Sequence, residues 1–243
     1  MSSFGALAGP LAGPLIVALD VDSADECLRL AHLLKGRAHA FKMGPRLCMR
    51  YGADLVKQVA ALAPVFIDNK YLDIPSTMEA AIRATHEAGA TLATVHAWAG
   101  PEALRKLSKV EAELASNRPF KILVVTLLTS FSKETLPATV TVKSLEDGVS
   151  TLADAALASG LTGIVCSPNE VSNLRAKSKE AFLVTPGVRL DRIVGDDQKR
   201  VETPASALSS GASALVVGRP IIEAKDPVEA ADRVLASIKE AKR

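Results

Sequence analysis

The chain has 243 residues, of which 48% are apolar, so it can bury one large core and we expect a single domain. Its formal net charge of +2 comes from 29 basic and 27 acidic residues mixed along the sequence. This balance argues against a broad positive surface, and we expect no nucleic-acid partner. The three cysteines are odd in number and not closely spaced, so the sequence predicts neither a disulfide framework nor a zinc site.

The N-terminal stretch from Phe4 to Val17 is apolar but does not resemble a secretion signal. No positive charge precedes it, and Gly9-Pro10 and Gly13-Pro14 interrupt it. We therefore expect a flexible tail over residues 1–14 and a folded domain over residues 15–243. No segment reaches the roughly 20 unbroken apolar residues of a membrane span, so we expect a cytoplasmic protein without a membrane partner.

Short apolar runs recur along the chain, and each is followed by a helical pattern. Buried parallel strands have this continuous apolar character because helices cover both faces of their sheet. Eight strand–helix units in about 250 residues predict an α/β fold, a single-domain (β/α)8 TIM barrel. The expected strands are Leu15–Leu19, Ala40–Met43, Val65–Ile67, Leu92–Val95, Ile122–Val125, Gly163–Val165, Phe182–Val184 and Ala214–Val217.

Helix starts are also marked in the sequence. Ser23-x-x-Glu26 and Ser76-x-x-Glu79 both match the capping-box pattern, so each serine is expected to cap a helix. Asp226-Pro227 predicts the start of the last helix, because proline fits the first turn, where a missing N–H is tolerated.

Two predicted connections, residues 126–143 and 187–203, are too long to be simple turns. Loops of this size in a compact domain usually serve as lids or binding loops. Both would leave the C-terminal mouth of the barrel, where barrel enzymes carry their active sites. Polar residues gather at the same strand ends, namely Asp20, Lys42, Asp68, Lys70, His96, Thr129 and Arg219.

The densest polar segment runs from Asp68 to Asp73. Residues two apart in a strand face the same side, so Asp68 and Lys70 should both point into the barrel and Asn69 outward. Lys42, from the neighbouring strand, would place a second ammonium beside Asp68. A structural salt-bridge network at the barrel rim is the alternative, although desolvating several charges is costly without a functional need.

The segment from Phe66 to Thr77, which reads FIDNKYLDIPST, resembles the signature of orotidine 5'-monophosphate decarboxylases. Further segments agree in order and spacing, and the similarity covers nearly everything from Leu15 to the C-terminus. They are Val17–Asp20, Phe41–Gly44, Val124–Ser130, and Leu183–Arg189 continuing through Gly195–Arg200 to Val216–Pro220. Asn69 departs from the pattern, since many family members carry leucine there.

The resemblance implies decarboxylation of orotidine 5'-monophosphate to uridine 5'-monophosphate by a homodimer without a cofactor or a metal. It implies that Lys70 protonates C6, that Asp68 lies against the departing carboxylate, and that Lys42 and Asp73 complete an alternating charge array. Asp73, Ile74 and Thr77 would reach into the partner's site. The remaining substrate contacts implied are Asp20 to ribose, Thr129 to the pyrimidine, and Arg189, Gln198, Gly218 and Arg219 to the 5'-phosphate.

The phosphate assignment also has support from the residues themselves. Gly218-Arg219-Pro220 follows the eighth strand, and Pro220 could open a short helix whose free N–H groups face an anion. The alternative is an ordinary tight turn with a surface arginine. His96 is a lone histidine at a strand end, where a structural role is commoner than a catalytic one.

Two other functions are compatible with this pattern. Sister barrel enzymes that decarboxylate or cleave sugar phosphates also carry D-x-K-x-x-D and use Mg2+, but they tend to have glutamate at the position of Lys42. A barrel that binds a nucleotide phosphate without catalysis is the second alternative, because the fold alone does not define an activity. The presence of all four charged residues, Lys42, Asp68, Lys70 and Asp73, argues against it.

Overall fold

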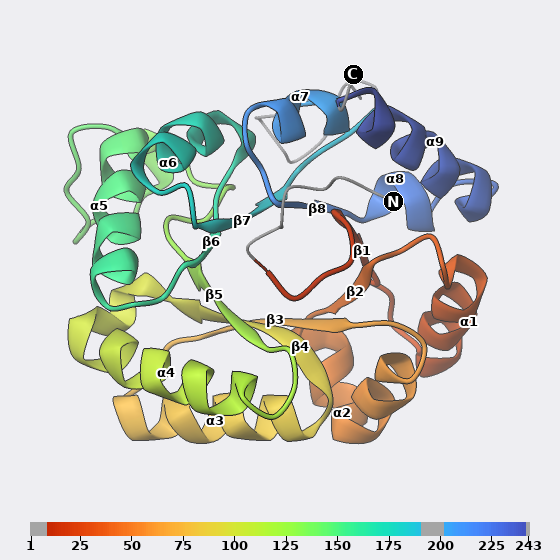
Figure 1. The fold of residues 1–243 in the computed structure, drawn as a ribbon, viewed down its shortest axis with the longest axis horizontal. Coiled ribbons are helices and arrows are strands. Elements are labelled where there is room, and N and C mark those ends of the chain that lie inside the picture. The colour runs from red at the N-terminus through yellow and green to blue at the C-terminus, as the bar shows by residue number, and fades with distance from the viewer. Residues whose placement is uncertain (1–8, 191–201, 242–243) are drawn as a thin grey trace.

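The computed structural model describes residues 9–190 and 202–241, which fold into the predicted (β/α)8 barrel. Eight parallel strands close into a barrel in sequence order, with β1 hydrogen-bonded to β8 (Figure 1). All eight predicted strands are confirmed. They are β1 (Leu15–Ala18), β2 (Ala40–Met43), β3 (Val65–Tyr71), β4 (Ala90–His96), β5 (Lys121–Val125), β6 (Gly163–Val165), β7 (Phe182–Pro186) and β8 (Ala214–Val217).

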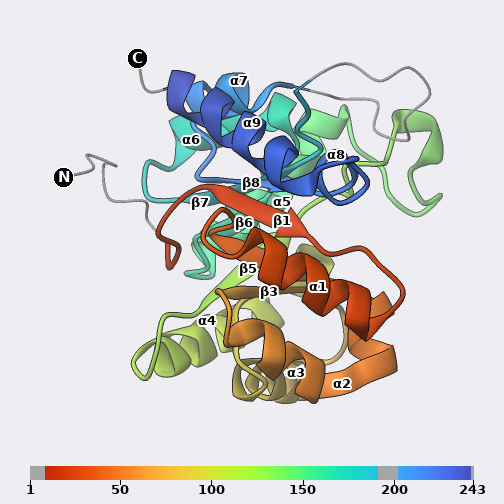
Figure 2. The same cartoon turned by 90° about the vertical axis from the view of Figure 1, so that its right-hand side faces the viewer.

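Helices surround the strands on all sides, as two perpendicular views show (Figures 1 and 2). The α-helices are α1 (Ala24–Leu34), α2 (Pro45–Ala60), α3 (Pro75–Glu87), α4 (Gly100–Ala115), α5 (Leu145–Ala158), α6 (Val171–Lys177), α7 (Pro204–Ser209), α8 (Arg219–Ile222) and α9 (Pro227–Glu240). Short 3-10 turns cover η1 (Ala97–Ala99), η2 (Lys133–Thr135) and η3 (Pro168–Glu170). None of the helices in the described part of the chain is long and apolar enough to span a membrane.

Alternation along the strands separates the barrel interior from the layer beneath the helices. Ile16 and Ala18 of β1 belong to the apolar cluster inside the barrel, whereas Leu15 and Val17 pack against the helices. The outward neighbours of Lys42 on β2 are fully buried under α1 and α2, so Lys42 faces the interior. This alternation brings polar side chains into an otherwise apolar interior near the C-terminal mouth.

Helix starts follow the sequence signals in two of three cases. Ser23 Oγ accepts a hydrogen bond from the Glu26 N–H, and Asp226 caps α9 by accepting from two backbone N–H groups. The prediction that Ser76 caps a helix is wrong, because α3 already begins at Pro75. Ile74 occupies the N-cap position instead, so the helix begins two residues earlier than the capping-box pattern implied, with Pro75 in its first turn.

The prediction of a flexible tail over residues 1–14 is wrong for residues 9–14, which pack against the barrel. Leu11 is buried and packs in the interior cluster with Phe66 and Phe182, at the end of the barrel opposite the polar mouth. Gly13 lies against His39, where any side chain would clash. Residues 1–8 lie outside the described residues.

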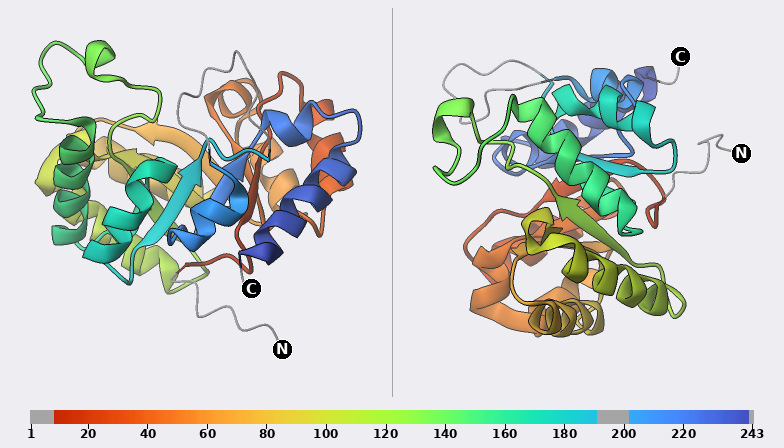
Figure 3. Two further views of the ribbon diagram at one scale, coloured as in Figure 1. Left: turned by 90° about the horizontal axis from the view of Figure 1, so that it is seen from above. Right: turned by 90° about the vertical axis from the view of Figure 1, so that its left-hand side faces the viewer.

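The two long connections leave the same mouth of the barrel. The segment between β5 and α5, drawn in green, projects away from the strands and contains the short η2 turn (Figure 3). The connection after β7 is described only at its two ends, where the Arg189 N–H donates to Glu202 O at 3.1 Å. The chain therefore leaves and re-enters the barrel at neighbouring points.

Candidate active site

A cavity of about 520 Å3 opens at the C-terminal mouth of the barrel. Eight of the residues predicted for the site line it together, from β2, β3, the start of α8 and the segments that follow β1, β5, β7 and β8. They are Asp20, Lys42, Asp68, Lys70, Thr129, Arg189, Gly218 and Arg219. The sequence prediction that these distant segments converge is confirmed.

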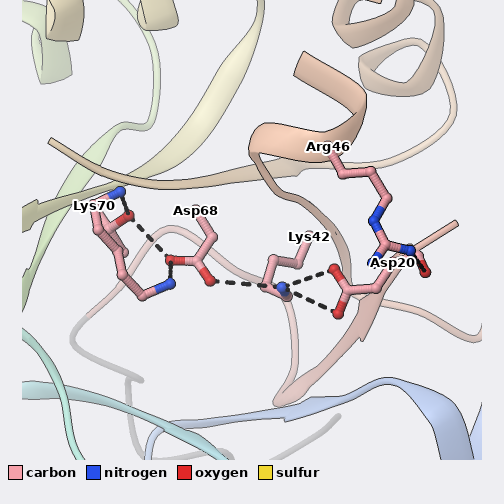
Figure 4. Close-up of polar contacts among 6 residues, drawn as sticks. Asp20, Lys42, Arg46, Asp68 and Lys70 are labelled. Carbon is pink, nitrogen blue, oxygen red and sulfur yellow. Dashed lines mark hydrogen bonds and ion pairs between the residues drawn. The ribbon is translucent and has the colours of Figure 1, made fainter. Parts of the chain in front are cut away.

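Four charged side chains form a row of alternating sign along one wall of this cavity (Figure 4). Lys70 Nζ lies 2.9 Å from Asp68 Oδ1, and the other Asp68 oxygen lies 3.5 Å from Lys42 Nζ. Lys42 Nζ also lies 3.1 Å from Asp20 Oδ1. The prediction of a second ammonium beside Asp68 is therefore confirmed, and each inner charge has an opposite charge on both sides.

Asp68 is ionised although it is largely buried, with 15% of its side chain exposed. Burial is the strongest single influence on its pKa and acts to raise it. The charges of Lys42 and Lys70, with hydrogen bonds from Lys70 and Thr94, outweigh burial and hold the Asp68 pKa below its ordinary value of 3.8. Asp68 therefore contributes a negative charge to the middle of the row despite its burial.

The backbone of β3 departs from regular strand geometry between Asp68 and Lys70. Ile67 pairs with Ala93 and Tyr71 with Val95, so the three β3 residues between them lie opposite the single β4 residue Thr94. Lys70 has φ 51°, and among the described non-glycine residues it alone has positive φ. Such a conformation costs about 1–3 kcal/mol and persists where surrounding contacts enforce it, which is commonest at functional sites.

This irregularity explains why the Asp68 and Lys70 side chains both face the cavity. The sequence argument used strict alternation, and both side chains do face the cavity as predicted. The bulged backbone, rather than a flat strand, provides that orientation. Asn69 points outward as expected and donates to the Tyr71 hydroxyl, which in turn contacts Thr85 on α3.

The rest of the cavity divides into an apolar floor and a polar edge. Phe66, Val125, Val165, Val184 and Val216 supply the apolar surface, and Thr129 with Ser130 supplies hydroxyl groups. Arg189 and Arg219 lie at the β7–β8 side, where α8 begins directly after Gly218 as the sequence predicted. The cavity thus has an apolar floor, with the charge row from Lys70 to Asp20 on one side and the two arginines on another.

Three predicted residues do not line the cavity of this chain. Asp73, Ile74 and Thr77 lie between β3 and the first turn of α3, and all three are exposed, with Ile74 63% exposed. Asp73 Oδ1 accepts from the Ile74 N–H at 2.6 Å. Gln198, predicted to bind phosphate, lies outside the described residues.

Residues set aside in the sequence have structural surroundings. His96 is buried, stacks near Trp98 with ring centroids 4.6 Å apart, and does not line the cavity. Burial lowers its pKa, and the charge of Lys70 adds to this effect. The three cysteines are free thiols, and burial raises the pKa of Cys166 to about 12.

Sequence reasoning missed two polar residues at the site, Thr94 and Ser130. Thr94 is fully buried and bonds to both Asp68 and Lys70, and Ser130 lines the cavity beside Thr129. A signal for Thr94 existed, because it is a polar residue within an apolar strand and shares the interior face with Leu92. Among residues 9–190 and 202–241, no three histidine, cysteine or acidic side chains form a group that could hold a metal ion.

Comparison with known proteins agrees with this site. The model of the "Orotidine 5'-phosphate decarboxylase / HUMPS family" matches residues 13–234. Orotidine 5'-phosphate decarboxylase of Trichlorobacter lovleyi is 41% identical over 227 residues, covering 92% of this chain and 94% of the relative. The Rhodopseudomonas palustris (strain HaA2) enzyme of the same name is 42% identical, with coverages of 94% and 95%.

Solved structures give the same result. The crystal structure of orotidine 5'-phosphate decarboxylase from Lactobacillus acidophilus superposes with a TM-score of 0.82 at 31% identity, covering 93% of this chain and 99% of that one. An uncharacterized conserved protein from Geobacillus kaustophilus superposes with a TM-score of 0.78 at 27% identity. Family model, relatives and fold coincide over nearly the whole chain, which therefore belongs to the orotidine 5'-phosphate decarboxylase / HUMPS family.

Proposed function

We propose that this chain decarboxylates orotidine 5'-phosphate to uridine 5'-phosphate, a carbon–carbon lyase reaction. The observation that carries the proposal is the unbroken row of Lys70, Asp68, Lys42 and Asp20 beside an apolar cavity in a member of this family. Loss of CO2 leaves an electron pair on C6 of the pyrimidine, where ring carbonyls cannot delocalise it. A protein that performs this reaction without an electron-accepting cofactor must supply charge and a proton.

Lys70 is suited to supply both. The C6–carboxylate bond breaks, its electron pair stays on C6, and an N–H of the Lys70 ammonium transfers its proton to that carbon. The nearby positive charge also stabilises the carbanion as it develops. Lys70 is left neutral and takes a proton back from solvent, which its 39% exposed side chain can reach.

Asp68 would have two effects on this step. Its carboxylate holds the Lys70 ammonium at 2.9 Å, and it would lie against the carboxylate that leaves as CO2. Lys42 lies between two carboxylates and keeps Asp68 ionised despite burial. The row thus keeps its charges aligned before substrate binds, so little reorganisation is needed during the reaction.

The remaining substrate groups fit the other walls. Asp20 would bind the ribose hydroxyls, Thr129 the pyrimidine edge, and Arg189 with Arg219 the phosphate. Arginine suits this last role because its planar guanidinium donates two parallel hydrogen bonds to a phosphate. Gly218 would let the phosphate approach the backbone, and Gln198 would join the phosphate contacts from the connection after β7.

We also propose a homodimer in which Asp73, Ile74 and Thr77 complete the partner's site. Their exposure in a single chain supports this arrangement, and so does the apolar surface formed by the neighbouring exposed residues Leu72 and Ile74. Large apolar side chains exposed beside a charged site are typical of a surface that another chain covers.

Purified protein treated with EDTA tests the function directly. We expect it to convert orotidine 5'-phosphate, followed by loss of ultraviolet absorbance, and to leave hexulose and ketogulonate phosphates unchanged with or without Mg2+. A strict requirement for Mg2+, or turnover of the sugar phosphates alone, would falsify the proposal in favour of the sister enzymes. Tight binding of the nucleotide without turnover would instead favour a non-catalytic barrel.

A further inference from the structure

Thr94 lies behind the charge row without lining the substrate cavity. It is 0% exposed, and on β4 it shares the interior face with Leu92. Its Oγ accepts a hydrogen bond from the Lys70 backbone N–H at 2.8 Å and donates one to Asp68 Oδ1 at 3.1 Å. A single buried hydroxyl therefore contacts both members of the Lys70–Asp68 pair.

The backbone at Lys70 needs such a partner. Between the Ile67–Ala93 and Tyr71–Val95 pairs, three residues of β3 lie opposite one residue of β4, so regular ladder bonds cannot form there. Lys70 has φ 51°, a left-handed conformation that side-chain-bearing residues seldom adopt. Thr94 is the one β4 residue opposite the bulge. Its hydroxyl, rather than a backbone carbonyl, accepts the hydrogen bond from the Lys70 N–H.

The direction of the two bonds matters. A hydroxyl has one hydrogen, so while Thr94 accepts from Lys70 it can give that hydrogen to Asp68. The bond to Lys70 fixes where its side chain leaves the backbone, and the bond to Asp68 fixes the carboxylate that holds the ammonium at 2.9 Å. One oxygen atom on the neighbouring strand, Thr94 Oγ, therefore holds both members of the Lys70–Asp68 ion pair in position.

We propose that Thr94 is a positioning residue for decarboxylation, which sets the location of the Lys70 ammonium through the Lys70 backbone and the Asp68 carboxylate. The proposal rests on the proposed function, because it concerns the same reaction. Removal of the hydroxyl should slow the chemical step and leave substrate affinity largely intact, since Thr94 does not line the cavity. Misplacing a reacting group by about 1 Å can lower a rate about a hundredfold.

Three variants test this role. Thr94→Val keeps the side-chain shape and removes both hydrogen bonds, Thr94→Ser keeps the hydroxyl, and Thr185→Val is the matched control. Thr185 on β7 is equally buried, but its hydroxyl lies near only the Cys166 sulfur, at 4.0 Å, among the contacts described. Steady-state kinetics with orotidine 5'-phosphate, the inhibition constant of uridine 5'-phosphate, and thermal unfolding should be measured for each.

We expect kcat to fall about a hundredfold in Thr94→Val with KM and product affinity within a few-fold of native. Thr94→Ser should recover most of kcat, and Thr185→Val should keep native kcat. An inactive native protein would refute the proposed function itself. With native activity present, the positioning role is refuted if Thr94→Val keeps its kcat, if the change lies in KM alone, or if Thr94→Ser or Thr185→Val loses as much.

Folding provides the last distinction. Should Thr94→Val not fold, Thr94→Ala removes the same hydroxyl without the branched side chain and carries the same kinetic expectation. If neither variant folds while Thr185→Val does, the hydroxyl supports the barrel rather than the site and the proposal is wrong.

Discussion

Lys70, the proposed proton donor, has a left-handed backbone conformation, so two substitutions there should separate activity from stability. Lys70→Ala and Lys70→Gly both remove the ammonium and should lose activity equally. They should differ in the free energy of unfolding, because alanine keeps a Cβ atom at φ 51° whereas glycine does not.

The expected difference can be worked from the local geometry. A left-handed conformation costs a non-glycine residue about 1–2 kcal/mol. Glycine gains about 0.4–1 kcal/mol of extra freedom in the unfolded chain, which opposes the benefit. We therefore expect Lys70→Gly to be more stable than Lys70→Ala by about 0.5–1 kcal/mol. The lost ion pair with Asp68 is the same in both variants, so it cancels from the comparison.

Urea unfolding and orotidine 5'-phosphate turnover should be measured on both proteins. A general acid contributes about 10²–10⁴-fold and electrostatic stabilisation about 10²–10³-fold, so both variants should lose at least about 10⁴-fold in kcat. The control pair is Lys109→Ala and Lys109→Gly at an exposed position inside α4, where glycine should be less stable by about 1 kcal/mol. The same ordering at Lys70 as at Lys109 would show that the backbone at Lys70 is not strained.

Further predictions concern the phosphate, the dimer and pH. Arg219→Ala should lower kcat/KM for orotidine 5'-phosphate by about 10²-fold or more and be partly rescued by free guanidinium, because lost phosphate binding also weakens transition-state binding; equal slowing of the phosphate-free nucleoside would contradict this. Mixing inactive Lys70→Ala and Asp73→Ala homodimers should restore part of the activity, since one of the two sites in each heterodimer contains both native residues. No recovery after verified subunit exchange would instead place Asp73 in the site of its own chain. Burial, with the charge of Lys70, lowers the pKa of His96, so below the ordinary value of 6.5 the unfolded chain takes up a proton that the folded chain does not. The free energy of unfolding should therefore fall as pH drops from 7 through 6.5 to the lowered folded pKa, and less steeply in His96→Gln; identical slopes would refute this cause.

The sequence predicted the barrel because an apolar strand followed by a helical pattern recurs eight times along the chain. An error in the start of one helix therefore does not alter the predicted fold. The wrong prediction of a cap at Ser76 illustrates this, because the helix begins two residues earlier, at Pro75, without any change in the fold. The packed segment around Leu11 was missed because an isolated apolar residue between Gly-Pro pairs has no periodicity.

The sequence could predict only those site residues that lie at or near the C-terminal ends of strands. Asp20, Lys42 and Asp68 converge because parallel strands in a barrel end at one mouth. The left-handed backbone at Lys70 and its bond to Thr94 depend on strand register, which sequence patterns do not specify at a bulge. The roles of Asp73, Ile74 and Thr77 remain predictions, since they concern a second chain.

The central claim is that the ammonium of Lys70 drives loss of CO2 from C6 of orotidine 5'-phosphate in the cavity that Asp68 and Lys42 share. Its most direct test is release of labelled CO2 from carboxyl-labelled orotidine 5'-phosphate, measured side by side for native protein and folded Lys70→Ala in EDTA. We predict one CO2 and one uridine 5'-phosphate per substrate from the native protein, and release slowed at least about 10⁴-fold in the variant. Release at near-native rate from folded Lys70→Ala, or none from the native protein, would contradict the account.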